Sequence, residues 1–198
     1  ETTEQNKINT TNLKMGLKES IKVAIRIRPP SLLESSSGDS LCLHADEENG
    51  LTLQTDKTSI QCNYSHVFGM SSTQDDVYES VKDSVNGIIA GINGCVFSYG
   101  QTGSGKTYTM LGQEGTEYDG VVVNAVRSLF QGLQIECANQ NSNGGTSHFS
   151  VHCSFLQIYN EKLMDLLGDS STNLTIRETA PKASGKRKSS APEVFVSG

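Results

Sequence analysis

The amino-acid sequence predicts an α/β fold, and three observations support that class. Strand-like and helix-like apolar patterns interleave along the chain. A short, mostly apolar run at residues 95–99 lies between two glycines, as the buried strands of parallel sheets often do. A capped helical pattern precedes this run, and a second helical pattern follows it. We therefore expect a mostly parallel central sheet flanked by helices.

Composition narrows the class of protein. The chain has 198 residues, enough for one domain with a core. Its formal net charge of -6 argues against a nucleic-acid-binding or anionic-membrane-binding surface, because such surfaces are basic. No apolar run reaches the roughly 18 residues of a transmembrane helix, and the polar residues 1–20 contain no signal peptide. The five cysteines, an odd number without a C-x-x-C pair, indicate reduced thiols in an intracellular protein. We expect no nucleic-acid partner and no membrane partner.

The two ends of the chain suggest a segment. It begins with Glu1 rather than methionine, and it ends at Gly198 directly after a strand-like Val-Phe-Val run. We expect the chain to be either processed or part of something longer.

The first third of the chain is expected to hold an arm and short strands. Residues 1–19 are polar without periodicity, which predicts a disordered arm. Residues 21–27 alternate apolar and polar side chains as a strand does, and two prolines end the pattern. Residues 31–39 indicate a loop. Three short strands are then expected, joined by polar turns, at 41–43, 51–53 and 59–68.

The middle of the chain predicts a capped helix and a buried strand. Ser72 or Thr73 can cap the helix, two aspartates follow in its first turn, and Gly91 ends it. Residues 95–99 are then expected to form a central strand buried on both faces. A second helix begins near Gly105, is interrupted by a loop, and resumes at residue 121.

The rest of the chain alternates between loops and short elements. The second helix is expected to stop near residue 133. The expected segments after it are a polar loop (136–147), a strand (149–159), a helical turn (161–167), a small strand (174–176), a loop (179–192) and a last strand (193–196).

One segment carries a chemical signature. The pattern G-x-x-x-x-G-K-[S/T] is matched at its four fixed positions by Gly100, Gly105, Lys106 and Thr107. The residues between the first two are Gln101, Thr102, Gly103 and Ser104. The glycines let the backbone wrap closely, so that successive N–H groups form a nest for phosphate oxygens. Lys106 supplies a point charge for the β- and γ-phosphates, and the hydroxyl of Thr107 suits Mg²⁺. An ordinary glycine-rich turn is disfavoured, because the match follows a predicted strand and opens a helix. The segment therefore predicts a P-loop NTPase.

The residues around this loop resemble the kinesin motor domain. Residues 67–81 resemble the stretch before the phosphate loop of that family, and residues 91–110 resemble its phosphate loop almost throughout. Arg26, Arg28 and Pro29 look like its R-x-R-P motif, and residues 155–167 look like its next central strand and turn. These matches occur in family order, which marks residues 20–198 as a partial kinesin motor domain.

The resemblance implies ligands, partners and residue roles. It implies an ATPase that binds ATP or ADP with Mg²⁺. The partner of the full motor would be the microtubule (tubulin), and its location would be the cytoplasm, on the microtubule cytoskeleton. Arg26, Arg28 and Pro29 should border the adenine, and Tyr108 should stack on it, which suits an aromatic face. Without the resemblance, solvated strand charge is the favoured explanation of the two arginines, and a packing aromatic is the alternative for Tyr108. No oligomeric state is indicated.

Two kinesin motifs do not occur in this sequence. They are the N-x-x-S-S-R-S-H loop and D-x-A-G-S-E, the switch motifs, which in kinesins position the attacking water and sense the γ-phosphate. Since phosphoryl transfer depends mostly on positioning and charge stabilisation, we expect a truncated N-terminal part that binds nucleotide, hydrolyses it poorly and holds no catalytic residue. The alternative is a nucleotide-binding remnant or regulatory kinesin-like protein without motor activity. Residues 67–110 disfavour an unrelated P-loop enzyme such as a small-molecule kinase.

A basic insertion is the last feature with a functional interpretation. Residues 182–188 include four basic side chains, which by resemblance face the acidic tubulin surface. A solvated or phosphorylated loop is the favoured explanation of these charges.

Overall fold

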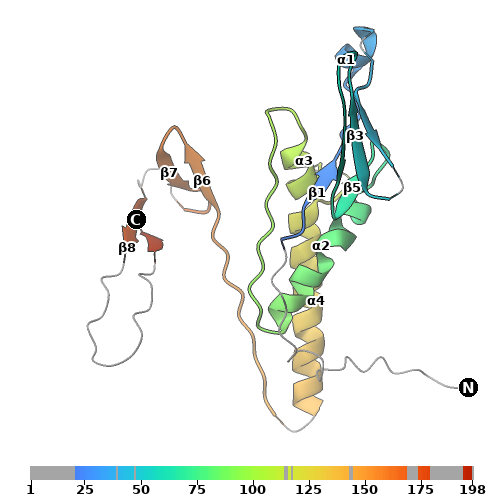
Figure 1. Ribbon diagram of the computed structural model, residues 1–198. Helices are drawn as coiled ribbons and strands as arrows, with labels where there is room; N and C mark the ends of the chain where they lie inside the picture. The colour runs from blue at the N-terminus through green and yellow to red at the C-terminus, as the bar shows by residue number, and fades with distance from the viewer. Residues whose placement is uncertain are drawn as a thin grey trace, which may run out of the picture. The chain divides into compact units, whose positions relative to one another are not determined.

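A computed structural model of the protein (Figure 1) describes residues 21–38, 40–46, 48–113, 116, 118–142, 145–168, 174–178 and 194–197. The chain divides into two compact units, residues 1–146 and 147–198, which are described separately. The expected arm at 1–19 and the basic segment at 182–188 lie outside the described residues.

A parallel pair of strands lies at the centre of the first unit. β1 (Ala24–Arg26) pairs with β5 (His66–Phe68) in the register Ala24 to His66 and Arg26 to Phe68. One further hydrogen bond, from the N–H of Ile27 to the carbonyl of Phe68 at 2.8 Å, extends the pair beyond Arg26. Because both strands run the same way, Arg26 and the residues after it leave the pair at its carboxyl end, where α/β folds place ligands.

A three-stranded antiparallel sheet adjoins this pair. It consists of β2 (Leu43–Ala45), β3 (Gly50–Gln54) and β4 (Ser59–Asn63), in that spatial order. The expected strands at 51–53 and 59–68 are thus confirmed, with the last one divided into β4 and β5, whereas the strand expected at 41–43 lies two residues later, as β2.

The expected loop at 31–39 is wrong over most of its length. Leu32–Ser36 form the short helix α1, which begins with a capping box. The hydroxyl of Ser31 accepts from the N–H of Glu34 at 3.3 Å, and the carboxylate of Glu34 accepts from the N–H of Ser31 at 2.7 Å. This reciprocal pair satisfies two N–H groups that an uncapped helix would leave without acceptors, and it explains why a helix forms here.

α2 (Gln74–Ile89) confirms the first predicted helix and its cap. The Thr73 hydroxyl accepts from the N–H of Asp76 at 3.1 Å, and the Asp76 carboxylate accepts from the N–H of Thr73 at 2.8 Å. The hydrogen bond from the Thr73 backbone is the main cause of the lowered pKa of Asp76. Gly91 follows the helix with φ of 82°, the left-handed conformation that commonly ends helices.

The second predicted helix also forms in two parts. α3 (Lys106–Leu111) follows the phosphate loop, and α4 (Val121–Ser142) begins after an intervening loop. α4 continues through residues 136–142 of the polar loop that was expected at 136–147, and polar side chains there make contacts one turn apart. The amide of Gln140 donates to Glu136 at 2.9 Å, and the hydroxyl of Ser142 donates to the carbonyl of Ala138 at 2.8 Å. The Gln140–Glu136 pair is of the i,i+4 kind that stabilises helices, whereas a serine hydroxyl bonded to the carbonyl four residues earlier does not add stability.

The core of the first unit lies where α2 and α4 pack side by side (Figure 1). Its buried apolar side chains come from α2, from α4 and from the residue that follows β1, and they are Val77, Tyr78, Val85, Val121 and Ile27. Among the described helices, none has both the length and the apolar character needed to cross a membrane.

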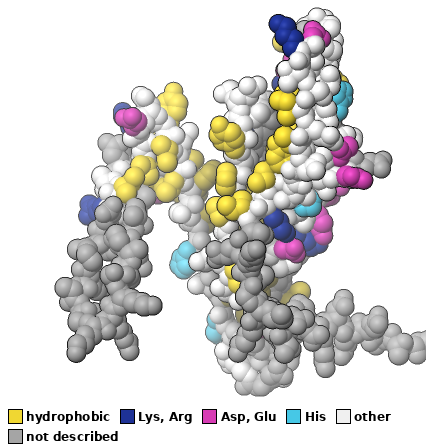
Figure 2. Space-filling view, in the orientation of Figure 1, with side chains coloured by type: hydrophobic (Ala, Val, Ile, Leu, Met, Phe, Trp, Pro, Cys, Tyr) yellow, Lys and Arg dark blue, Asp and Glu magenta, His cyan; other side chains and the backbone are white. Residues whose placement is uncertain are grey.

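The predicted central strand at 95–99 is wrong. The segment is irregular, with the side chain of Phe97 80% exposed and that of Tyr99 96% exposed. Figure 2 shows apolar side chains gathered at the surface of the molecule. A strand needs hydrogen-bonding neighbours, and no strand among the described residues pairs with this segment. Apolar composition alone therefore does not produce the strand.

Among its described residues, the second unit contains two antiparallel strand pairs. β6 (Leu156–Tyr159) pairs with β7 (Lys162–Asp165) across a two-residue turn in which Asn160 and Glu161 have φ of 49° and 61°. Two positive φ values are typical of a type I′ hairpin turn. The helical turn expected at 161–167 is therefore wrong, and the strand expected over 149–159 is confined to its last four residues.

The last two strands confirm the prediction from the sequence. β8 (Thr175–Glu178) pairs antiparallel with β9 (Val194–Ser197). The α/β class holds for the chain, with β1 and β5 as its parallel pair and the remaining described pairs antiparallel.

Candidate functional site

The glycine-rich segment at 100–107 forms a loop that leads into a helix. Residues 100–105 consist of turns and bends, and α3 begins at Lys106. Gly103 and Gly105 have φ of 80° and 96°, which side-chain-bearing residues rarely adopt. A Cβ atom at Gly100 would lie only 2.5 Å from Oγ of Ser104. The left-handed backbone therefore favours glycine at 103 and 105, and a side chain at position 100 would require Ser104 to move.

The backbone of this loop presents hydrogen-bond donors. The N–H of Ser104 donates to the carbonyl of Gln101 at 3.2 Å, closing the turn. Within the part of the chain that the structure describes, the N–H groups of Gly103 and Gly105 donate to no acceptor. Residues 100–107 also contain no carboxylate. The loop thus has the donors of an anion-binding nest without a competing negative charge.

Lys106 and Thr107 add a charge and a hydroxyl to the loop. Nζ of Lys106 donates to the carbonyls of Gly100 and Gln101, each at 2.8 Å. A lysine ammonium has three donors, so one remains for a ligand. Thr107 is exposed, and its hydroxyl forms no hydrogen bond to any described residue. This set of donors fits a polyphosphate, and the Thr107 oxygen fits Mg²⁺, which prefers oxygen ligands.

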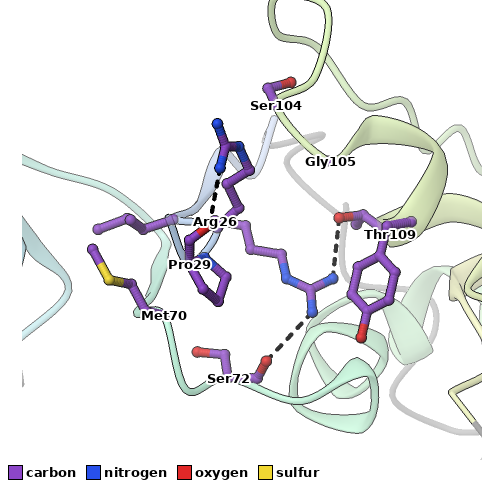
Figure 3. A pocket seen from close by; sticks show the side chains of 10 residues that line it. Arg26, Pro29, Met70, Ser72, Ser104, Gly105 and Thr109 are labelled. Carbon is purple, nitrogen blue, oxygen red and sulfur yellow. Dashed lines mark hydrogen bonds between the residues drawn. The ribbon is translucent and has the colours of Figure 1, made fainter. Parts of the chain in front are cut away.

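A cavity of about 190 Å³ lies beside the loop (Figure 3). Six of the residues predicted for the site line it, namely Arg26, Arg28, Pro29, Ser104, Gly105 and Tyr108. The structure therefore brings the R-x-R-P segment after β1 next to the end of the phosphate loop. Gly100, Gln101, Thr102, Gly103, Lys106 and Thr107 do not line this cavity and belong to the loop beside it.

Arg26 is anchored inside this site. Its Nη1 donates to Oε1 of Gln74 at 2.7 Å and to Oγ1 of Thr109 at 3.0 Å, and its Nη2 donates to the carbonyl of Ser72 at 3.3 Å. Figure 3 shows its side chain reaching toward Thr109. Its guanidinium carbon lies 5.2 Å from the ring centroid of Tyr108, a cation–π distance. Burial lowers the pKa of Arg26, but arginine stays protonated in proteins. It is not a solvated strand charge.

Arg28 is held from outside the cavity by α1. Its Nη1 and Nη2 donate to the two oxygens of Glu34 at 2.8 and 2.6 Å, and Nη1 also donates to the carbonyl of Pro29 at 2.9 Å. The Arg28 hydrogen bond is the largest cause that lowers the pKa of Glu34 to about 2. The charge of Arg28 is thus balanced within the protein, which leaves Lys106 as the cation of the phosphate loop.

Sequence reasoning missed several residues of the site. Ile27, Met70, Ser72 and Thr109 line the cavity, and Gln74 supports it from below the surface with 5% of its side chain exposed. Ile27 and Thr109 could have been predicted, because they are sequence neighbours of predicted site residues. The sequence carries no signal for Gln74, since a polar residue at the start of a helix is normally exposed.

Comparison with known proteins gives consistent matches. The family model of the kinesin motor domain matches residues 26–188. A kinesin heavy chain of Botryotinia fuckeliana is 35% identical over 184 residues, which make up 91% of this chain and 20% of that protein. Kinesin-like protein 3 of Schizosaccharomyces pombe is 35% identical over 161 residues, which make up 80% of this chain and 28% of that protein. Among solved structures, the motor domain of the Kar3-like kinesin from Ashbya gossypii has a TM-score of 0.61 and 30% identity.

These matches cover most of this chain but less than half of each of these related proteins. The aligned part covers 80% of this chain but 48% of the solved motor domain, and this chain spans about a fifth of the length of the Botryotinia protein. The family match at residues 26–188 begins at Arg26 and includes both the R-x-R-P segment and the phosphate loop. With most of its residues matched, the chain belongs to the kinesin motor domain family.

Proposed function

We propose that this chain binds ATP or ADP with Mg²⁺ and is the nucleotide-binding part of a microtubule-dependent motor ATPase. The observation that carries the proposal is the conformation of residues 100–107, a loop with two left-handed glycines that leads into α3. The adjoining cavity adds a place for the nucleoside, since it opens directly beside Gly105.

Each residue type has a role in this proposal. The backbone N–H groups of residues 100–107 and the ammonium of Lys106 hold the phosphates. Thr107 holds Mg²⁺, which when bound neutralises the charge of the phosphate oxygens. Arg26, Pro29 and Tyr108 border the base. The cavity of about 190 Å³ is below the 300–1,000 Å³ or so of typical ligand pockets, which suits one planar part of a nucleotide.

The motor activity belongs to the larger protein in this proposal. Residues 20–198 are one part of a motor domain, in which ATP binding and hydrolysis drive movement along microtubules in the cytoplasm. The two switch motifs of the family do not occur in these 198 residues. Because phosphoryl transfer depends on groups that position water and stabilise charge, the chain by itself binds nucleotide and hydrolyses it poorly.

The absence of the two switch motifs from the sequence also favours one alternative function. A nucleotide-binding or regulatory kinesin-like protein without motor activity also needs the phosphate loop and not the switch motifs. The two functions differ in what the intact protein does with microtubules.

Calorimetry on the 198-residue chain tests nucleotide binding directly. We expect one site for ATP in the presence of Mg²⁺. A microtubule-stimulated ATPase assay on the same sample then tests hydrolysis, for which we expect little or no turnover. Robust stimulated turnover would refute the statement that the absent motifs are required.

A further inference from the structure

Gln74, the first residue of α2, has a side chain that joins three elements of the site. Its Oε1 accepts from Nη1 of Arg26 at 2.7 Å, at the end of β1. Its Nε2 donates to the backbone carbonyl of Tyr108 at 2.6 Å, in α3. Only 5% of the side chain is exposed, and Gln74 is the buried polar residue among those that the structure describes.

We propose that Gln74 is a positioning residue for the base side of the site, because one buried amide holds both Arg26 and Tyr108. This inference rests on the proposed function, nucleotide binding, and names a residue that the phosphate-loop motif does not include. Gln74 contacts Arg26 and Tyr108 but does not line the cavity, so it acts through these two residues and not by touching the ligand.

The chemistry of an amide explains why glutamine serves here. The contact with Arg26 needs an acceptor, and the contact with the Tyr108 carbonyl needs a donor. Glutamine offers both at the end of one side chain. Leucine offers neither, and a carboxylate offers only acceptors. Buried polar groups require such partners, since losing one leaves the other unsatisfied.

The start of α2 fixes where this amide lies. Thr73 caps the helix through reciprocal hydrogen bonds with Asp76. Gln74 follows directly, so its backbone position is set by the cap. The length of the side chain then spans from α2 to both Arg26 and α3.

The consequence concerns the orientation of an aromatic ring. Arg26 lies 5.2 Å from the ring centroid of Tyr108, and Gln74 holds the guanidinium on one side and the Tyr108 backbone on the other. Stacking of a planar base depends on where that ring lies. Without Gln74, Arg26 keeps only its bonds to Thr109 and the carbonyl of Ser72. Binding of the purine base of a nucleoside triphosphate should therefore weaken, whereas binding of its phosphates should not.

The test compares two ligands on the full 198-residue chain. ATP with Mg²⁺ engages both the loop and the base side, whereas inorganic tripolyphosphate with Mg²⁺ engages the loop alone. We expect Gln74→Leu to weaken ATP binding about tenfold, within the range of one base-stacking contact, and to leave tripolyphosphate binding within about twofold. Gln61→Leu, an exposed glutamine on β4, is the matched control and should change neither affinity. Calorimetry measures all three proteins.

Several outcomes would overturn the inference. Unchanged ATP affinity in Gln74→Leu would mean that Gln74 does not set the base side. Loss of both ligands would mean that Gln74 maintains the whole fold and has no separate role at the base. If the wild-type chain binds neither ligand, the proposed function itself fails. If the wild-type chain and the Gln74→Leu chain bind ATP and tripolyphosphate with the same affinities, only this inference fails.

Two further variants make the result independent of how well Gln74→Leu folds. Gln74→Glu keeps an acceptor for Arg26 and offers no donor to the Tyr108 carbonyl, so it should lose ATP affinity and keep tripolyphosphate affinity. Equal ATP affinity in this variant and wild type would contradict the inference. The loss of ATP affinity in the double variant Gln74→Leu with Tyr108→Ala should be smaller than the sum of the two separate losses, because residues that act through each other are not additive. Additive losses would also overturn it.

Discussion

The ammonium nitrogen of Lys106 lies 2.8 Å from the carbonyl oxygen of Gly100, six residues earlier in the chain. A second bond of the same length joins it to the carbonyl of Gln101. The lysine that the motif assigns to phosphates therefore also holds the loop closed. Because Lys106 has both roles, a substitution there should lower the affinity for the ligand strongly and the stability of the protein slightly.

Lys106→Ala tests the charge at the loop. We expect ATP binding to fall below detection by calorimetry, because the only cation of the loop is removed. Stability should fall by about 1 kcal/mol in urea denaturation, the typical net value of a hydrogen bond. Lys82→Ala is the control, since Lys82 forms an exposed pair with Glu79 and such pairs contribute little. Unchanged ATP affinity in Lys106→Ala would contradict the site.

The pair of Arg28 and Glu34 predicts a pH dependence of stability. Glu34 has a pKa lowered from 4.5 to about 2 in the folded state. A carboxylate with a lowered folded pKa stabilises the fold above its unfolded pKa, and this stabilisation is lost as the pH falls toward the folded pKa. The melting temperature of wild type should exceed that of Glu34→Gln above about pH 4.5, and the difference should shrink between pH 4.5 and 2.

High salt provides the control for this experiment. The pair is exposed, and at 1 M salt charges are screened beyond about 3 Å. Because salt weakens exposed ion pairs, the difference between wild type and Glu34→Gln should be smaller in 1 M NaCl at pH 7, where both groups are charged. A difference that stays constant from pH 7 to pH 2 would show that the ion pair does not form in solution.

Tyr78 predicts a stabilising substitution. Its side chain is 8% exposed, and its hydroxyl is the buried side-chain atom without a hydrogen-bond partner among the described residues. Tyr78→Phe keeps the ring in the core and removes the unsatisfied hydroxyl, so stability should rise by about 1 kcal/mol. Urea denaturation measures this change. Tyr99→Phe, at a 96% exposed position, should stay within about 0.5 kcal/mol of wild type. A loss of stability in Tyr78→Phe would reveal a partner for the hydroxyl.

The site was predictable where its chemistry is local in sequence. The loop at 100–107 needs left-handed glycines and a lysine at fixed spacing, and these can be read from a motif. The cap of α2 is similar, because Thr73 and Asp76 are three residues apart. The capping box of Ser31 and Glu34 follows the same rule and was open to prediction, although the surrounding residues suggested a loop.

The parts that could not be predicted depend on residues far apart in the chain. Residues 95–99 have the composition of a central strand, but a strand forms only where neighbours pair with it, and no described strand does. Gln74 is 34 residues from Tyr108 and 48 from Arg26, so its role is visible only in three dimensions. Asn160 and Glu161 form a turn although glutamate at positive φ is uncommon.

Thr107 predicts how Mg²⁺ contributes to binding. Its side chain is exposed and its hydroxyl forms no hydrogen bond to a described residue, so Thr107→Val, which has nearly the same shape, should fold as wild type does. We expect wild type to bind ATP more tightly with Mg²⁺ than with EDTA, because the metal offsets phosphate charge and takes the Thr107 oxygen as a ligand. In Thr107→Val the affinity in EDTA should be unchanged, whereas most of the gain on adding Mg²⁺ should be lost. The EDTA measurement is the internal control, since it reports the loop and Lys106 without the metal. An equal gain from Mg²⁺ in both proteins would exclude Thr107 as the metal ligand and leave the phosphate-binding role of the loop intact.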